Sequence, residues 1–200
     1  GHPGGSLVNL VLSRTPLSPI GAPIRPGVVH RLDRGTSGAI VFAKTEASHR
    51  NLANQFCNRT VEKIYWALLS GVLPHLQGEI ECAIQPSREN PTKMSVRFFR
   101  GRPALTRYRV LARGNDISLV EVRPITGRTH QIRVAFQFLD FPVIGDPVYG
   151  RPCATIGRPA LHARVLGFDH PETGLRLRFT APLPSDFIMA AGTLLNGVPL

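Results

Sequence analysis

The chain has 200 residues, 42% of them hydrophobic, which is enough for one domain or for one large domain with a subdomain. Its 24 lysines and arginines against 13 acidic residues give a net charge of +11, and only Lys44, Lys63 and Lys93 are lysines. Arginine binds phosphate bidentately and stacks on bases, so this excess favours a nucleic-acid partner; the alternative is a soluble protein from an arginine-preferring genome.

The first quarter of the chain predicts two helices separated by loops. Ser6 is a typical N-cap for a short helix at residues 7–13, and Thr45 is one for a helix that ends near residue 59, with Leu52 and Phe56 four residues apart on one face. Four prolines between residues 16 and 26 predict a loop. Short apolar runs at 28–29 and 39–43 predict buried strands on either side of a polar segment.

The rest of the chain is dominated by strands. They are expected at residues 63–73, 79–84, 94–99, 105–112 and 118–122, and a hairpin is expected from 161–168 to 175–179. Helices are expected at 128–139 and 185–195. Because the strands follow one another in pairs, the pattern predicts an α+β fold with a mixed, mostly antiparallel sheet flanked by helices.

The polar segment between the two apolar runs has the sequence HRLDRGTSG at residues 30–38. It holds one carboxylate, Asp33, among arginines, a histidine and hydroxyl groups, and this surrounding favours the ionised form. The sequence therefore indicates a carboxylate that either attacks a substrate or holds an arginine. A second dense polar run, GRTHQIR, follows at residues 127–133.

Five motifs in one order carry a family resemblance. They are HRLDRGTSG at 30–38, KIYWAL at 63–68, GRTHQIR at 127–133, GDPVYG at 145–150 and LHA at 161–163. Together they closely resemble the RluA-type RNA pseudouridine synthases over nearly the whole chain. The resemblance implies a uridine isomerase whose target base is detached from ribose, rotated and rejoined through carbon.

The same resemblance implies the catalytic residues Asp33, Tyr65 and Arg128. Asp33 corresponds to the nucleophile, with attack on the sugar C1′ and abstraction of the 2′ proton as alternative roles. Tyr65 corresponds to the residue that stacks on the base, and it faces away from Trp66 if the strand alternates. We predict an Asp33–Arg128 ion pair; the alternative for Arg128 is a phosphate contact.

Further residues are candidates for contacts with the substrate. In this family, side chains of the nucleophile loop lie near a base that has been flipped out of the RNA. Leu161 corresponds to an apolar floor of the base pocket, with an ordinary core position as its alternative. His130 is more simply a structural hydrogen-bonding group, and Arg133 a surface or RNA contact. The expected substrate-binding set is His30, Arg31, Arg34, Thr36, His130, Arg133 and Leu161.

Other kinds of site are not indicated. The three cysteines are far apart, so neither a disulfide framework nor a structural zinc site is expected, and a reducing compartment is favoured. The histidine motifs lack carboxylates or thiols at ligand spacing, and the glycines form no nucleotide-binding loop. We therefore expect no metal and no cofactor. No apolar run approaches the roughly 18 residues that span a bilayer.

The expected partner is rRNA or tRNA, and the expected state is a monomer, in the cytoplasm or in a mitochondrion or plastid. Residues 1–200 are expected to form the catalytic domain without its first strand and without an S4-like RNA-binding domain before it. Relatives often carry Asp where Gly35 stands, and a His-containing continuation after Arg133 where residues 134–137 stand. The alternative function is an inactive RNA-binding or ribosome-assembly module of the same fold, which the +11 charge supports equally well.

Overall fold

The computed structural model describes residues 6–90, 92–97 and 101–195. Their backbone divides into two compact units, which are considered separately. The first unit is drawn from residues 1–32, 39–62 and 166–180, and the second from 33–38, 63–165 and 181–200. The sequence predicts one domain, or one large domain with a subdomain. In the structure each of the two units combines three separate segments of the chain.

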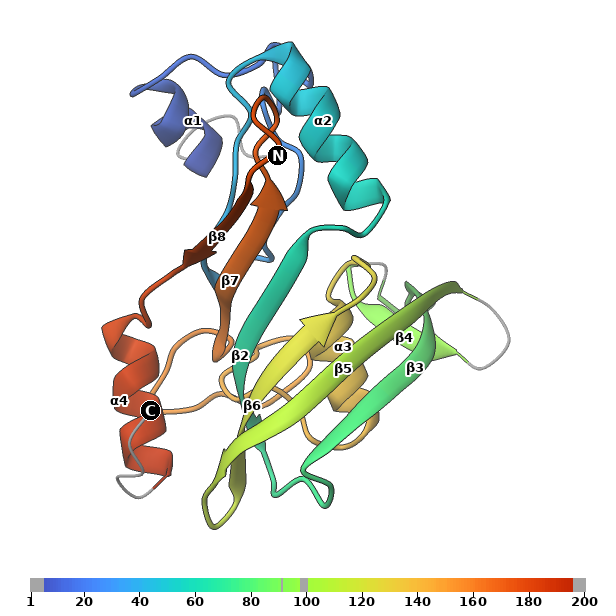
Figure 1. Cartoon of the computed structure of the whole chain (residues 1–200). Helices are drawn as coiled ribbons and strands as arrows, with labels where there is room; N and C mark the ends of the chain where they lie inside the picture. Colours follow the sequence, from blue (N-terminus) through green and yellow to red (C-terminus); the bar gives the residue numbers. More distant parts are fainter. Residues whose placement is uncertain (1–5, 91, 98–100, 196–200) are drawn as a thin grey trace. The chain divides into compact units, whose positions relative to one another are not determined.

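A mixed sheet dominates the fold (Figure 1). Its strand order is β1-β7-β2-β6-β5-β3-β4, and β8 also pairs with β7. The short β1 is parallel to β7, whereas the pairs β2–β6, β6–β5, β5–β3 and β3–β4 are antiparallel. The strands are β1 (Ser37–Gly38), β2 (Glu62–Ser70), β3 (Gln77–Pro86), β4 (Met94–Arg97), β5 (Arg102–Arg113), β6 (Ile117–Pro124), β7 (Leu161–Asp169) and β8 (Arg176–Thr180).

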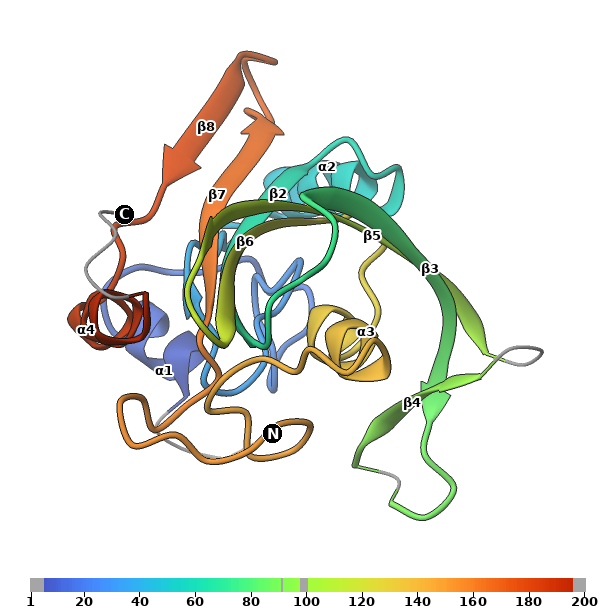
Figure 2. The same cartoon turned by 90° about the horizontal axis from the view of Figure 1, so that it is seen from below.

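Within the described residues the helices are α1 (Leu7–Leu12), α2 (Glu46–Cys57), α3 (Gln131–Phe138) and α4 (Ser185–Leu194). Two predicted N-caps are confirmed, since the side chains of Ser6 and Thr45 accept hydrogen bonds from the backbone N–H groups of Asn9 and Ser48. In the second unit, Figure 2 shows the strands β6, β5 and β3 curving around α3. The predicted mixed, mostly antiparallel sheet flanked by helices is confirmed.

Three predicted elements differ from the structure. The apolar runs at 28–29 and 39–43 form no strands; only an isolated bridge joins Phe42 to Val28. The backbone of Ala43 instead bonds to loops, because its N–H donates to Gly27 and its carbonyl accepts from Ser18. The helix expected from residue 128 begins at Gln131. Residues 98–99 of the strand expected at 94–99 lie outside the described residues.

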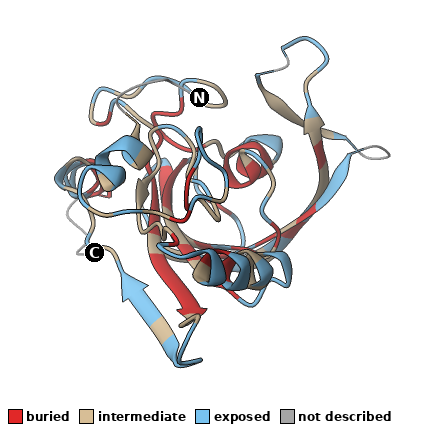
Figure 3. Ribbon diagram, turned by 90° about the horizontal axis from the view of Figure 1, so that it is seen from above, coloured by how far each residue is buried: buried red, intermediate tan, exposed pale blue. Residues whose placement is uncertain are grey.

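The core of the second unit joins the sheet to α3 and α4. Phe136 of α3 and Phe187 of α4 are fully buried, together with Leu68 of β2 and Val120 of β6. Figure 3 shows this burial as red segments in α3 and the central strands. The first unit has a smaller core of its own, in Ala43, Leu52, Val61, Leu166 and Phe168. Helix α3, which carries the last three residues of the second polar motif, is therefore packed into this core.

In the part of the chain that the structure describes, none of the helices combines the length and the apolar character that a bilayer crossing requires.

Replacing Phe136 with alanine is expected to lower the free energy of unfolding by about 3–5 kcal/mol, because the change leaves a cavity between α3 and the sheet. Phe179→Ala is the matched control, since that side chain is 51% exposed, and its cost should be less than half as large. Denaturant titration of both variants measures this difference. Equal costs would contradict the placement of the core.

Candidate active site

Asp33 stands in a tight turn at the start of the second unit. The backbone carbonyl of Asp33 accepts the N–H of Thr36 at 2.9 Å, and Gly35 supplies a left-handed residue with φ 83°. The chain then enters β1, where Gly38 lies so close to β7 that a Cβ would clash with the Ala163 carbonyl. The turn is thus fixed to the sheet, with the Asp33 side chain 18% exposed.

His162 of β7 holds this turn in place through Ser37. It is buried, and its Nδ1 lies 2.9 Å from the Ser37 hydroxyl while its Nε2 lies 3.3 Å from the Ala181 carbonyl. A carbonyl can only accept, so Nε2 carries the hydrogen and Nδ1 accepts from Ser37. Burial lowers the pKa of His162, which favours this neutral ring.

Arg133 of α3 is the arginine that faces Asp33. Its Nη1 lies 3.5 Å from Asp33 Oδ2, and its guanidinium also makes a bidentate pair with Asp146, at 2.6 Å and 2.8 Å. The side chain of Arg133 is 4% exposed and that of Asp146 is fully buried. One buried guanidinium therefore serves two carboxylates, of which only Asp33 reaches solvent.

Asp146 fixes the guanidinium in place. Its Oδ1 also accepts the backbone N–H groups of Val148 and Tyr149, at 2.9 Å and 3.2 Å. Burial raises the pKa of Asp146, but the hydrogen bonds from Arg133 and from these backbone groups lower it by more, so its pKa lies below the ordinary value. Asp146 stays ionised, and its two oxygens bind Nε and Nη2 while Nη1 faces Asp33.

Tyr65 of β2 belongs to the same site electrostatically. Its strand partner is Val122, whereas the next residue, Trp66, pairs with Glu121 on the alternate face and lies under the guanidinium of Arg164. Burial and, to a lesser extent, the charge of Asp33 raise the pKa of Tyr65 to about 12. The phenol is therefore protonated at neutral pH, so it can donate a hydrogen bond or stack, but it is a poor base.

The predicted Asp33–Arg128 ion pair is wrong. Arg128 Nε donates instead to the Pro103 carbonyl at 3.0 Å, and Asp33 pairs with Arg133. The reason is local: His130 adopts a left-handed conformation with φ 54°, so α3 starts at Gln131 and only Arg133 projects from its first turns. Gln131, by accepting the Arg128 N–H at 2.9 Å, keeps Arg128 in the preceding loop.

The other candidate residues in the second unit differ in their contacts and burial. His130 Nδ1 is 2.8 Å from the Tyr149 hydroxyl, and the Tyr149 ring packs against the Arg133 guanidinium at 5.1 Å. Leu161 is buried in the core. Thr36 Oγ1 is buried without a hydrogen-bond partner among the described residues, and Arg34 is exposed.

Two candidates fall in the first unit. His30 accepts the Val41 N–H at 3.0 Å through Nε2 and stacks on Phe56 with a centroid distance of 4.5 Å. These contacts give His30 a structural task in the loop that leads to Asp33. Arg31 is exposed.

Sequence reasoning gave no role to Asp146 or His162, although both lie in motifs that it singled out. The signal was present in GDPVYG, where one carboxylate stands in an otherwise apolar segment. A buried carboxylate requires a cationic or hydrogen-bonding partner. Among the described residues, no group of three or more His, Cys, Asp or Glu side chains is arranged to hold a metal ion.

Comparison with known proteins gives the family of this chain. The family model described as RNA pseudouridylate synthase matches residues 6–138, and the chain belongs to that family. This confirms the resemblance drawn from the five motifs.

Individual relatives agree. An uncharacterised RNA pseudouridine synthase of Bacillus subtilis, YlyB, is 45% identical over 93% of this chain, and the ribosomal large subunit pseudouridine synthase D of Zymomonas mobilis is 40% identical over 93%. The chain spans 62% of the length of each. The chloroplastic RNA pseudouridine synthase 2 of Arabidopsis thaliana is 40% identical over 86% of the chain, which spans 47% of it.

Two solved human structures share the fold. RNA pseudouridylate synthase domain containing 1 is 32% identical, with a TM-score of 0.69 over 78% of this chain and 68% of that one. RNA pseudouridylate synthase domain containing 4 is 29% identical, with a TM-score of 0.70 over 84% of this chain and 76% of that one.

Replacing Asp146 with asparagine is expected to lower the free energy of unfolding at neutral pH by about 3–5 kcal/mol, because Arg133 loses its bidentate partner while it stays buried. The folded-state pKa of Asp146 is below its usual 3.8, so its ion pair stabilises the protein fully above about pH 4 and is lost as the pH falls further.

Denaturant titration of the wild type and Asp146→Asn from neutral to acidic pH measures the effect. The difference between them should shrink on acidification below about pH 4. A difference that does not change with pH would contradict the ionised pair.

Proposed function

We propose that this chain is an RNA pseudouridine synthase that isomerises specific uridines in structured RNA, with Asp33 as nucleophile and with no metal or cofactor. The pairing of a partly exposed Asp33 with the buried guanidinium of Arg133 carries this proposal. A carboxylate held in this way is a competent nucleophile toward an oxocarbenium-like sugar carbon. Family membership and the +11 charge support an RNA substrate.

The reaction is an isomerisation, so its atoms balance within the substrate. Asp33 attacks C1′ as the bond from C1′ to N1 of uracil breaks, and the base rotates while it stays bound. A bond then forms between C1′ and C5, Asp33 leaves, and the hydrogen of C5 is lost as a proton while N1 gains one. Arg133 orients the Asp33 carboxylate for the attack on C1′ and pairs with it again when it leaves.

Other residues are proposed to hold the base and the RNA. The protonated Tyr65 stacks on the flipped uracil, and Leu161 forms an apolar floor. A base must leave its helix or stem to reach Asp33, at a cost of a few kcal/mol of stacking, and the exposed Arg31 and Arg34 contact the RNA around the vacated position. Thr36 is proposed to contact the substrate, and the absence of a hydrogen-bond partner for its hydroxyl among the described residues supports this.

The proposed substrate is ribosomal RNA or transfer RNA, with ribosomal RNA favoured because relatives carry the name ribosomal large subunit pseudouridine synthase D. We propose that residues 1–200 belong to the catalytic domain, that it acts as a monomer, and that it works inside the cell or in an organelle, where such RNA is found.

Asp33→Ala is expected to abolish the release of tritium from RNA transcribed with 5-tritiated uridine, because closing the C1′–C5 bond expels the hydrogen at C5. RNA binding, measured by fluorescence anisotropy, should remain within about twofold, since phosphate contacts dominate affinity. Turnover in the variant would remove Asp33 from the mechanism. Binding without turnover in the wild type, on ribosomal and transfer RNA alike, would favour the inactive binding module.

Arg133→Lys is expected to lower the rate of tritium release by about a hundredfold or more, because lysine keeps the charge but loses the planar fork that spans Asp33 and Asp146. Arg128→Ala is the matched arginine control and should lose much less, since Arg128 contacts the Pro103 carbonyl. Single-turnover kinetics with saturating enzyme separates this loss from binding. A larger loss in the Arg128 variant would reverse the assignment.

A further inference from the structure

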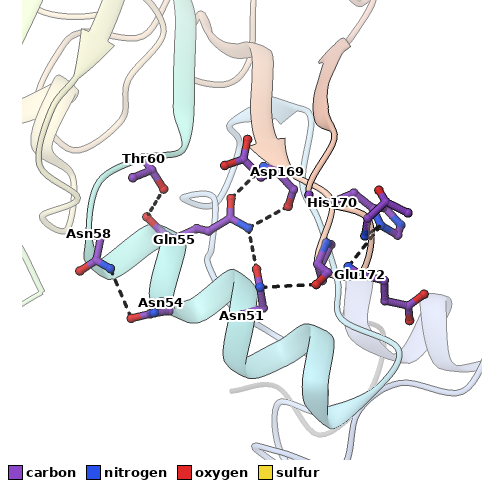
Figure 4. A pocket seen from close by; sticks show the side chains of 11 residues that line it. Asn51, Asn54, Gln55, Asn58, Thr60, Asp169, His170 and Glu172 are labelled. Carbon is purple, nitrogen blue, oxygen red and sulfur yellow. Dashed lines mark hydrogen bonds between the residues drawn. The ribbon is translucent and has the colours of Figure 1, made fainter.

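A row of amide side chains on α2 borders a pocket in the first unit. Asn51, Asn54, Gln55 and the C-cap residue Asn58 are spaced three, one and three residues apart, which places them on one face of the helix and its end. They line a cavity of about 430 Å³ together with Asp169 at the end of β7 and the turn that follows it, residues 170–174 (Figure 4). Ligand pockets usually measure about 300–1,000 Å³, so this one can hold a small molecule or a single base.

Gln55 builds the pocket by joining its two walls. Its side-chain oxygen accepts the Asp169 N–H at 2.8 Å, while its amide nitrogen donates to the Asp169 carbonyl at 2.7 Å and to Asn51 Oδ1 at 2.6 Å. The amide thus occupies both backbone groups of Asp169, as Figure 4 shows. The helix and the turn are held at a set separation, so the pocket exists before any ligand arrives.

Two other amides keep hydrogen-bonding capacity for a ligand. Asn58 Nδ2 donates a long bond of 3.4 Å to Asn54 Oδ1. Neither the Nδ2 group of Asn54 nor the Oδ1 atom of Asn58 has a partner among the described residues. The pocket therefore offers a free donor and a free acceptor from neighbouring turns of one helix.

The charge of the pocket disfavours phosphate. None of the described residues that line it is a lysine or an arginine, although the chain has 24 of them, and Glu172 adds a negative charge to the lining. Arg176 is already engaged, by the Thr60 carbonyl at 3.3 Å and Asp169 at 3.2 Å. The best ligand is therefore neutral and carries a donor beside an acceptor.

We propose that this amide pocket binds an unpaired nucleobase, adenine in preference to guanine, in the RNA substrate. Adenine presents an amino donor beside a ring-nitrogen acceptor, the pattern that asparagine and glutamine read bidentately, whereas guanine presents two acceptors at the equivalent edge. The RNA substrate itself rests on the proposed function. The pocket would add base recognition to a surface whose many arginines contact phosphate without regard to sequence.

Photo-crosslinking locates the contact directly. The probe is a short single-stranded oligoadenylate that carries one 8-azidoadenosine. Cleavage after arginine isolates the helix wall as residues 51–59 and the turn wall as residues 165–176. We expect crosslinks in one or both of these peptides, reduced by excess unlabelled oligoadenylate and less by oligoguanylate. Crosslinks that avoid both peptides would overturn the proposal.

Variants test whether the base is what is bound. Asn54→Ala and Asn58→Ala should each weaken oligoadenylate binding at least about fivefold by fluorescence anisotropy, and leave binding of an abasic oligonucleotide of equal charge unchanged. Asn115→Ala, on an exposed turn of the second unit, is the matched control. Equal losses on both probes, or none, would overturn base recognition. Gln55 is left intact because its loss would open the pocket itself.

The two proposals fail in different ways. Neither Asn54 nor Asn58 is in the proposed catalytic machinery, so tritium release by saturating enzyme should stay near the wild-type rate in both variants. Absence of release from the wild type would contradict the proposed isomerase and leave the crosslink result standing. Normal release with no crosslink in the pocket would contradict the base pocket alone.

Discussion

The site depends on the ion pairs made by the buried guanidinium of Arg133. A charged group with 4% exposure is stable only if its hydrogens are matched by acceptors, and Asp146 satisfies two of them from a fully buried position. This pairing leaves one face of the guanidinium for Asp33. The carboxylate of Asp33 can therefore stand partly in solvent while its counter-charge does not move. Without Asp146, Asp33 and water would compete for the hydrogens of the Arg133 guanidinium.

Two kinds of attachment hold the opposite side of the ion pair. The turn that bears Asp33 joins the sheet through two parallel backbone pairings, and His162 reinforces it by accepting from Ser37. His162 can do so because burial keeps it neutral and the Ala181 carbonyl fixes its tautomer. Backbone pairing sets where Asp33 stands, and the histidine keeps the turn from rotating away.

Much of this arrangement could be predicted from the sequence, and there is a physical reason why the remaining features could not. Ser6 and Thr45 act through the next turn of their own helices, so local sequence predicts them. Whether Arg128 or Arg133 pairs with Asp33 depends on the left-handed backbone of His130. The residue type alone does not predict this conformation. The spacing of the amide side chains along α2 can also be read from the sequence. Their partner Asp169 is 114 residues away from Gln55, so only the fold shows that the two lie together.

The distances along the chain between the partners also govern when the site can form during synthesis. Asp33 and Arg133 are 100 residues apart, and the histidine that steadies the Asp33 turn depends on the carbonyl of Ala181, near the end of the second unit. At about 5–20 residues per second, a ribosome needs several seconds to a few tens of seconds to pass from Asp33 to Ala181. A nascent chain that has exposed Asp33 therefore holds an unorganised loop until Arg133 and Ala181 have also been synthesised.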